Sequence, residues 1–308
     1  MMFRIVLHAL FMLIPAMFIL PGLAGADDTE SYETEKIADG VYLFRSGAQR
    51  SLFLVGETGV IVTDPLNQAA AKVYRESISR VTKLPVKYVV YSHYHWDRVA
   101  GGQIFKEEGA RFIAQERCTQ RFRVNPNPAV VMPDVSFADR LDVSVGDMTL
   151  EMHYFGPSHG DCLTVFLVEP ANLMQIVDMV NPPRASFPID PNVPHIRPHN
   201  VRQFFGAVDN LVAERGVQEI VASRAGMLTD GTMITATGPV IAVRGQAAFW
   251  SSIFTVVDVA NGQGQIGLDS FVHMEAIDLN LFKPYAGYEP NDLPLIMRRF
   301  VGYLAMGR

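Results

Sequence analysis

Short apolar runs, each bounded by glycine, proline or aspartate, dominate the first half of the chain. Such runs cover residues 40–45, 51–56 and 59–64, and a longer one covers residues 86–92. Their β-branched and aromatic side chains predict β-strands. Similar runs predict further strands at residues 111–114, 148–154, 164–168, 174–177 and 219–223.

Apolar residues recur at helical spacing later in the chain. Phe204, Val208 and Leu211 belong to such a pattern over residues 201–214, which predicts an amphipathic helix. By contrast, residues 181–200 hold six prolines and no helical period, so we predict a long irregular segment. Other helices are predicted at residues 67–81, from residue 101, at 246–259 and at 294–306.

The order of these elements predicts an α/β fold. Strands first follow one another directly and later alternate with helices. This order fits a four-layer αββα sandwich of two mixed β-sheets flanked by helices better than a doubly wound parallel sheet.

The composition is that of a folded protein. The 308 residues are 49% hydrophobic and 19% charged, which excludes an intrinsically disordered chain. The formal net charge is −6 and no basic run stands out, so we expect no nucleic-acid partner.

Residues 1–26 have the pattern of a secretory signal peptide. A short segment with Arg4 precedes an apolar run, and Ala24-Gly25-Ala26 forms an A-x-A cleavage site. We therefore expect a single mature domain over residues 27–308, in the periplasm or secreted, without membrane attachment after cleavage. The alternative is a retained membrane anchor, although the stretch is near the lower length limit for a spanning helix.

The mature chain carries two cysteines, Cys118 and Cys162. An oxidising compartment permits a disulfide between them. Two separate buried thiols fit the sequence equally well.

The most informative segment comes directly after the predicted strand 86–92. There His93, His95 and Asp97 alternate along the chain, so in an extended segment their side chains point the same way. Two imidazoles and a carboxylate suit Zn²⁺. The structural alternative is a polar strand end at which the histidines cap backbone groups.

Two later segments strengthen the metal-site hypothesis. His159 lies in a glycine- and proline-rich turn after a strand, and Asp178 follows an apolar run. A buried strand seldom ends on a lone aspartate without a partner or a metal.

In their order and spacing these motifs resemble the metallo-β-lactamase fold superfamily of hydrolases, over most of the mature chain. The matching positions are Asp64, His93, His95, Asp97, His159 and Asp178. The resemblance implies a zinc ion bound by the three histidines. It also implies a second ion bound by Asp97, Asp178 and a final histidine. It also implies that Asp64 orients a ligand or loop, and that Asp97 positions the zinc-bound water or accepts its proton.

The chain departs from the family pattern at the final histidine. Arg224 or Thr237 stands at that place, and Arg98 follows Asp97 where two-zinc hydrolases often have histidine. Arg98 or Arg224 would bring positive charge to the second site, by pairing with an aspartate or by holding a substrate anion. We therefore predict one firmly bound Zn²⁺, with the second site weak or absent.

Two histidines of the proline-rich segment, His195 and His199, are candidates for substrate contacts or for the missing ligand. The simpler interpretation is that both are solvent-exposed loop residues.

Together, these features predict a periplasmic or secreted zinc-dependent hydrolase that cleaves an ester, lactone, thioester or amide-type bond of a small-molecule substrate through a zinc-bound water. The alternative is an attenuated pseudoenzyme or ligand-binding protein on the same fold, because the last metal-ligand histidine is missing. A β-lactamase proper and an iron oxidoreductase fit less well, because both normally need that ligand.

Overall fold

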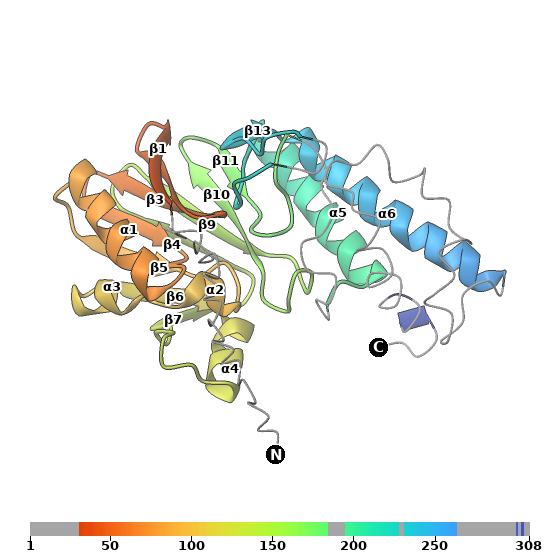
Figure 1. Cartoon of the computed structure of the whole chain (residues 1–308), viewed down its shortest axis with the longest axis horizontal. Coiled ribbons are helices and arrows are strands. Elements are labelled where there is room, and N and C mark those ends of the chain that lie inside the picture. The colour runs from red at the N-terminus through yellow and green to blue at the C-terminus, as the bar shows by residue number, and fades with distance from the viewer. Residues whose placement is uncertain (1–30, 184–194, 228–230, 264–299, 301–302, 305–308) are drawn as a thin grey trace, which may run out of the picture. The chain divides into compact units, whose positions relative to one another are not determined.

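Figure 1 shows a computed structural model of the chain, in which residues 31–183, 195–227, 231–263, 300, 303 and 304 are described. The chain divides into residues 1–30 and residues 31–308. The predicted signal peptide and nearly all of the predicted helix 294–306 lie outside the described residues. Within the described ranges, no helix combines the length and hydropathy that a membrane span requires.

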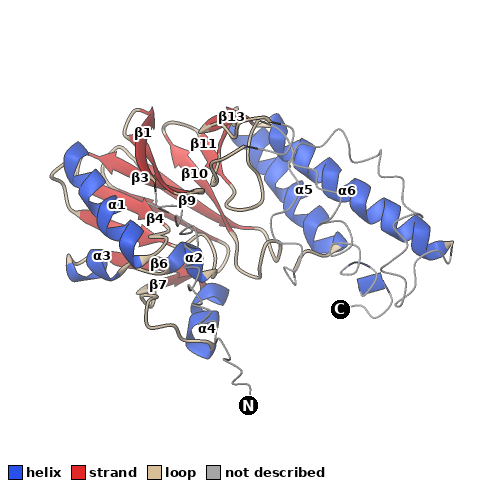
Figure 2. Cartoon of the chain, viewed as in Figure 1, coloured by secondary structure: helices blue, strands red, loops and turns tan. Residues whose placement is uncertain are grey.

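Two mixed β-sheets flanked by helices make up the fold, as predicted (Figure 2). The seven strands of the first sheet lie side by side in chain order: β1 (Tyr32–Ala38), β2 (Val41–Ser46), β3 (Gln49–Gly56), β4 (Gly59–Thr63), β5 (Val86–Val90), β6 (Arg111–Gln115) and β7 (Val135–Phe137). From β1 to β4 the neighbours pair antiparallel, and from β4 to β7 they pair parallel.

The second sheet has six strands in the order β13-β12-β11-β10-β9-β8. These are β8 (Arg140–Ser144), β9 (Thr149–Tyr154), β10 (Thr164–Glu169), β11 (Leu173–Gln175), β12 (Glu219–Val221) and β13 (Thr237–Pro239). Only β11 and β12 pair parallel in this sheet.

Six helices are described outside the sheets. They are α1 (Gln68–Val81), α2 (Trp96–Val99), α3 (Gln103–Glu107), α4 (Glu116–Val124), α5 (Pro198–Arg215) and α6 (Ile241–Gly262). The last two run side by side (Figure 1).

Alternation along the first sheet divides its apolar side chains between two cores. In β3, Leu52 and Leu54 pack in the core shared with the second sheet, whereas Phe53 packs in the core beneath α1, where its ring meets Tyr74. Successive side chains of a strand point to opposite faces, so a strand covered on both faces is apolar at every position. This explains why the strand runs of the sequence are continuous rather than alternating.

Some predicted boundaries were wrong. The helix α5 begins at Pro198, so the predicted irregular segment 181–200 ends before residue 198. Proline suits the first helical position, because its missing N–H would have no partner there. Within that segment, residues 184–194 lie outside the described residues.

The apolar pattern also missed several elements, namely β1, α2, α4, β7, β8 and β13. The two outer strands β7 and β13 have only three residues each, and β1 is largely exposed. Such elements bury too few side chains to produce a periodic apolar signal.

Cys118 in α4 and Cys162 form a disulfide, which decides between the two alternatives left by the sequence. Both cysteines are fully buried. The bond attaches α4 to the segment that precedes β10.

Candidate metal centre

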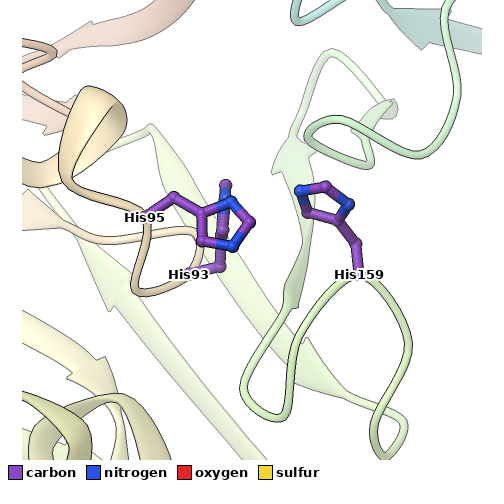
Figure 3. A group of neighbouring side chains, drawn as sticks. All are labelled: His93, His95 and His159. Atoms are coloured by element: carbon purple, nitrogen blue, oxygen red, sulfur yellow. The ribbon is translucent and has the colours of Figure 1, made fainter. Parts of the chain in front are cut away.

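Three histidines from two loops converge on one point (Figure 3). His93 and His95 come from the loop after β5, and His159 comes from the turn between β9 and β10. The ring centroids lie 4.5 Å apart for His93 and His95, 5.1 Å for His93 and His159, and 4.9 Å for His95 and His159. One ligand nitrogen from each ring lies within 4.8 Å of the other two. The structure thus brings together the three residues that the sequence predicts as the first metal site.

Asp64 holds the first of these loops in place. Its Oδ1 accepts a hydrogen bond from the backbone N–H of Ser92 at 2.8 Å, and the Ser92 hydroxyl lies 2.9 Å from Nδ1 of His93. This contact engages Nδ1 and leaves Nε2 of His93 directed at the centre of the site.

The Asp64 carboxyl is itself unusual. Its backbone φ is 36°, in the left-handed region, and its side chain is buried. Burial raises the pKa of Asp64 to about 7, against the opposing effects of its hydrogen bonds with Ser92 and of the Arg98 charge.

Two of the three histidines present unpartnered nitrogen atoms. Nε2 of His93 and Nε2 of His159 are buried and have no hydrogen-bond partner among the described residues. The carboxylate oxygen Oδ2 of Asp178 is 3.6 Å from the first and 3.8 Å from the second, beyond hydrogen-bond distance. Because a buried polar atom without a partner is costly, the arrangement indicates that a ligand belongs between these rings.

Both of these histidines are held in the neutral form. Burial, followed by the neighbouring imidazoles, lowers the pKa of His93 well below its usual value. Burial also lowers the pKa of His159 to about 4, although the Asp178 charge opposes this. Neutral imidazoles are the form that coordinates metals. The residues present therefore fit one metal ion that prefers nitrogen ligands.

Asp178 lies beside the histidines, but its carboxylate is paired with two arginines. The Arg98 guanidinium donates from Nε to Oδ2 at 3.1 Å and from Nη2 to Oδ1. Arg224 donates from Nε to Oδ1 at 2.8 Å. Burial raises the pKa of Asp178, but the charge of Arg98, with those of the neighbouring histidines and Arg224, outweighs burial and holds the pKa well below its usual range. The carboxylate is therefore a permanent anion with its oxygens already engaged.

A network of hydrogen bonds holds Asp178 and Arg98 in place. The backbone N–H of Asp178 donates to the Ser223 hydroxyl at 2.9 Å, and Arg98 donates to the carbonyl oxygens of Arg50 and Ser223, each at 3.3 Å. Asn181 Oδ1 in turn accepts the backbone N–H of Ser223 at 3.1 Å. Ser223 and Asn181 belong to none of the sequence motifs, and their only signal in the sequence is proximity to Arg224 and Asp178.

A second metal ion does not fit this arrangement. Its expected ligand Asp178 is paired with two cations, and Arg224 rather than an imidazole reaches the carboxylate. Thr237, the alternative position for the last ligand, lies in β13 opposite Val221. A dication placed beside two guanidinium groups would be repelled by both.

Asp97 has a glutamine as its hydrogen-bond partner. It is exposed, in the first turn of α2, and its Oδ2 accepts a hydrogen bond from Gln49 Nε2 at 2.6 Å. The group of metal-binding atoms found among the described residues contains neither Asp97 nor Asp178.

The two histidines of the proline-rich segment have partners outside the three-histidine group. Nε2 of His195 lies 3.2 Å from Nη2 of Arg121, and Nδ1 of His199 lies 3.1 Å from the hydroxyl of Tyr303. Within the described residues, neither joins the group of metal-binding atoms.

Comparison with known proteins agrees with this geometry. Residues 45–174 match the family model described as the metallo-beta-lactamase superfamily, and this range contains Asp64 and all three histidines but not Asp178 or Arg224. The solved structure of a metallo-beta-lactamase from Pontibacter korlensis aligns with a TM-score of 0.59 and 17% identity, over 72% of this chain and 99% of that chain. The DIM-1 metallo-beta-lactamase aligns with a TM-score of 0.59 and 12% identity, over 72% of this chain and 97% of that chain. These structural similarities establish the fold.

One curated relative is named for a different reaction. The alpha subunit of 2,4-dinitroanisole O-demethylase from Nocardioides sp. (strain JS1661) is 26% identical over 153 residues, which are 49% of this chain and 47% of that protein. The chain therefore spans about half the length of this relative.

Proposed function

Because the chain belongs to the metallo-beta-lactamase superfamily, we propose that it is a zinc-dependent hydrolase that cleaves an ester, lactone, thioester or amide-type bond of a small molecule. The observation that carries this proposal is the convergence of three imidazole nitrogens within 4.8 Å of one another. Three histidine ligands with a fourth position open to water or substrate are typical of catalytic rather than structural zinc.

The residues of the chain have separate roles in this proposal. His93, His95 and His159 hold the zinc, and Asp64 orients the first of them through Ser92. Zinc at this site supplies Lewis acidity and a nucleophilic water at neutral pH.

Asp97 is the proposed proton acceptor. It is exposed to solvent and oriented by Gln49. Asp178 is unsuited to that role, because its pKa is lowered and both of its oxygens are engaged by arginines.

We further propose that only one zinc ion binds firmly. The arginine pair around Asp178 supports this, since it supplies positive charge where a two-metal enzyme has its second ion. One metal ion stabilises less developing negative charge than two. We therefore expect weaker activity on unactivated substrates than a two-metal hydrolase has.

The N-terminal pattern and the disulfide together support a periplasmic or secreted location for the mature protein. Ala24-Gly25-Ala26 provides a cleavage site, and a disulfide persists in oxidising compartments.

The test is metal analysis followed by a substrate panel on the same preparation. We expect about one zinc per chain, and hydrolysis of at least one ester, lactone, thioester or β-lactam by the zinc-loaded protein. The panel also includes 2,4-dinitroanisole and related aryl methyl ethers, because of the name of the 26% identical relative. The D97N variant should bind zinc normally but turn over more slowly.

A second candidate function is ligand binding without turnover. The observation that favours it is the replacement of the last metal ligand by Arg224, which leaves Asp178 paired rather than available. Stoichiometric zinc with no activity across the panel, together with saturable binding of a panel compound, would support this candidate over a hydrolase.

A further inference from the structure

The helix α4 contacts both of the loops that carry the metal-binding histidines. Its Cys118 is bonded to Cys162, three residues beyond His159. Arg121 lies three residues after Cys118 in the same helix, so both side chains project from neighbouring positions on one face.

Arg121 contacts both loops at once. Its Nε is 2.8 Å from Oδ2 of Asp161, in the loop of His159. Its guanidinium carbon is 4.9 Å from the ring centroid of Tyr94, the residue between the other two metal-binding histidines. A guanidinium at this distance from an aromatic ring makes a favourable cation–π contact.

The two loops also approach each other closely beside Arg121. Gly160 has a φ of +133°, and a Cβ at this residue would lie 2.9 Å from Cε1 of Tyr94. The Tyr94 ring is therefore in contact with the backbone directly after His159. The backbone carbonyl of Asp161 accepts a hydrogen bond from the Tyr154 hydroxyl at 2.7 Å, which attaches this loop to β9.

We propose that Arg121 is a positioning residue of the metal centre, and that it sets how closely His159 approaches His93 and His95. The disulfide anchors α4 to one loop, and the cation–π contact of Arg121 with Tyr94 links α4 to the other. The inference rests on the proposed function in one respect only, namely that a metal binds at the three histidines.

A positioning role and a merely structural role of Arg121 predict different effects on metal affinity and on folding stability. The Arg121 side chain is 43% exposed, so its ion pair with Asp161 is screened by water and contributes little to global stability. In contrast, loss of a side chain bonded directly to a metal ligand typically lowers metal affinity by roughly 10- to 100-fold. Arg121 acts through Tyr94 and Asp161, the neighbours of the ligands, so the effect of its loss should lie at the lower end of that range. Removing Arg121 should therefore change metal binding much more than folding.

The test compares R121A and R121K with R123A, a matched control because Arg123 lies exposed on the same helix. Zinc affinity is measured by competition with a chromophoric chelator, and ligand geometry by the visible absorption of the Co²⁺-loaded protein. We expect R121A to bind zinc roughly 10-fold or more weakly with altered Co²⁺ bands. R121K should fall between R121A and the wild type, because lysine keeps the charge opposite Asp161 but loses the guanidinium contact with the Tyr94 ring. R123A should match the wild type in both measurements.

Wild-type zinc affinity and Co²⁺ bands in R121A would overturn the inference while leaving the proposed function intact. If the wild type itself bound neither ion, the proposed function would fail as well. Should R121A not fold, D161N removes the partner charge at nearly constant volume and is expected to weaken zinc binding in the same direction. A D161N variant with wild-type affinity would then count against the inference.

Discussion

The Arg98 guanidinium makes paired contacts with both carboxylate oxygens of Asp178, and both side chains are almost fully buried. Planar two-point pairing of this kind is available to arginine and not to lysine. It engages both oxygens of the carboxylate that family resemblance would assign to a second metal ion. The pair is therefore relevant both to the stability of the protein and to the proposal that only one metal ion binds firmly.

Removal of the Asp178 charge should destabilise the fold strongly. The D178N variant leaves the buried Arg98 without its counter-ion, and such losses cost about 3–5 kcal/mol. Urea denaturation of the metal-free proteins measures the effect. D209N is the matched control, because Asp209 pairs with Arg244 on the exposed surface and should change the free energy of unfolding far less. Equal effects in the two variants would contradict the importance of the buried pair.

Replacement of any one of His93, His95 and His159 by alanine should sharply lower bound zinc. Each variant keeps at most two imidazoles at the site, which is too few for firm binding. Metal analysis after dialysis gives the stoichiometry, and the zinc-dependent rise in thermal midpoint should shrink in parallel. H199Q serves as the control, because His199 contacts Tyr303 instead. The assignment is wrong if all three alanine variants retain wild-type zinc.

A second zinc ion should bind only after both arginines are replaced. In R224H the carboxylate is still engaged by Arg98, so we expect about one zinc per chain, as in the wild type. The double variant R98H/R224H frees Asp178 and adds nitrogen donors, so its second-site occupancy should rise. Titration calorimetry with zinc distinguishes one site from two. Two firmly bound ions in the wild type would refute the single-metal proposal.

Asp64 should make the stability of the protein fall as the pH rises from about 4 to about 7. In the folded state its pKa is raised from 3.8 to about 7, so the folded protein holds a proton that the unfolded chain releases over this range. Three pKa units correspond to about 4 kcal/mol. Asparagine cannot ionise and keeps an acceptor for Ser92, so the stability of metal-free wild type relative to D64N should decrease over this range. A difference that does not vary with pH would show that burial does not perturb Asp64.

The mature protein should begin near Asp27. Mass spectrometry of the periplasmic or culture fraction should find a chain that lacks residues 1–26, because the A-x-A site precedes Asp27. Recovery of a full-length chain only in the membrane fraction would instead indicate a retained anchor.

Local sequence was sufficient for the elements with strong periodic patterns. The runs at residues 51–56, 59–64 and 164–168 correspond to β3, β4 and β10, because each is buried on both faces and is therefore apolar along its length. Helix α1 was likewise predicted within a residue of its start. Surface elements such as β1 and α4 gave no comparable signal, since their exposed positions accept polar residues.

The sequence by itself determined the histidines of the site, since alternation after a buried strand places His93 and His95 on one side and a glycine-rich turn presents His159. Only the tertiary structure decided the partners of the charged residues. Arg98 follows Asp97 directly in the chain but pairs with Asp178, 80 residues away, and the exposed Asp97 meets Gln49 instead. Periodicity describes the geometry of neighbouring residues, whereas contacts between distant segments depend on how the two sheets pack. For the same reason the disulfide, and the choice of Arg224 over Thr237 beside Asp178, could be identified only in the folded chain.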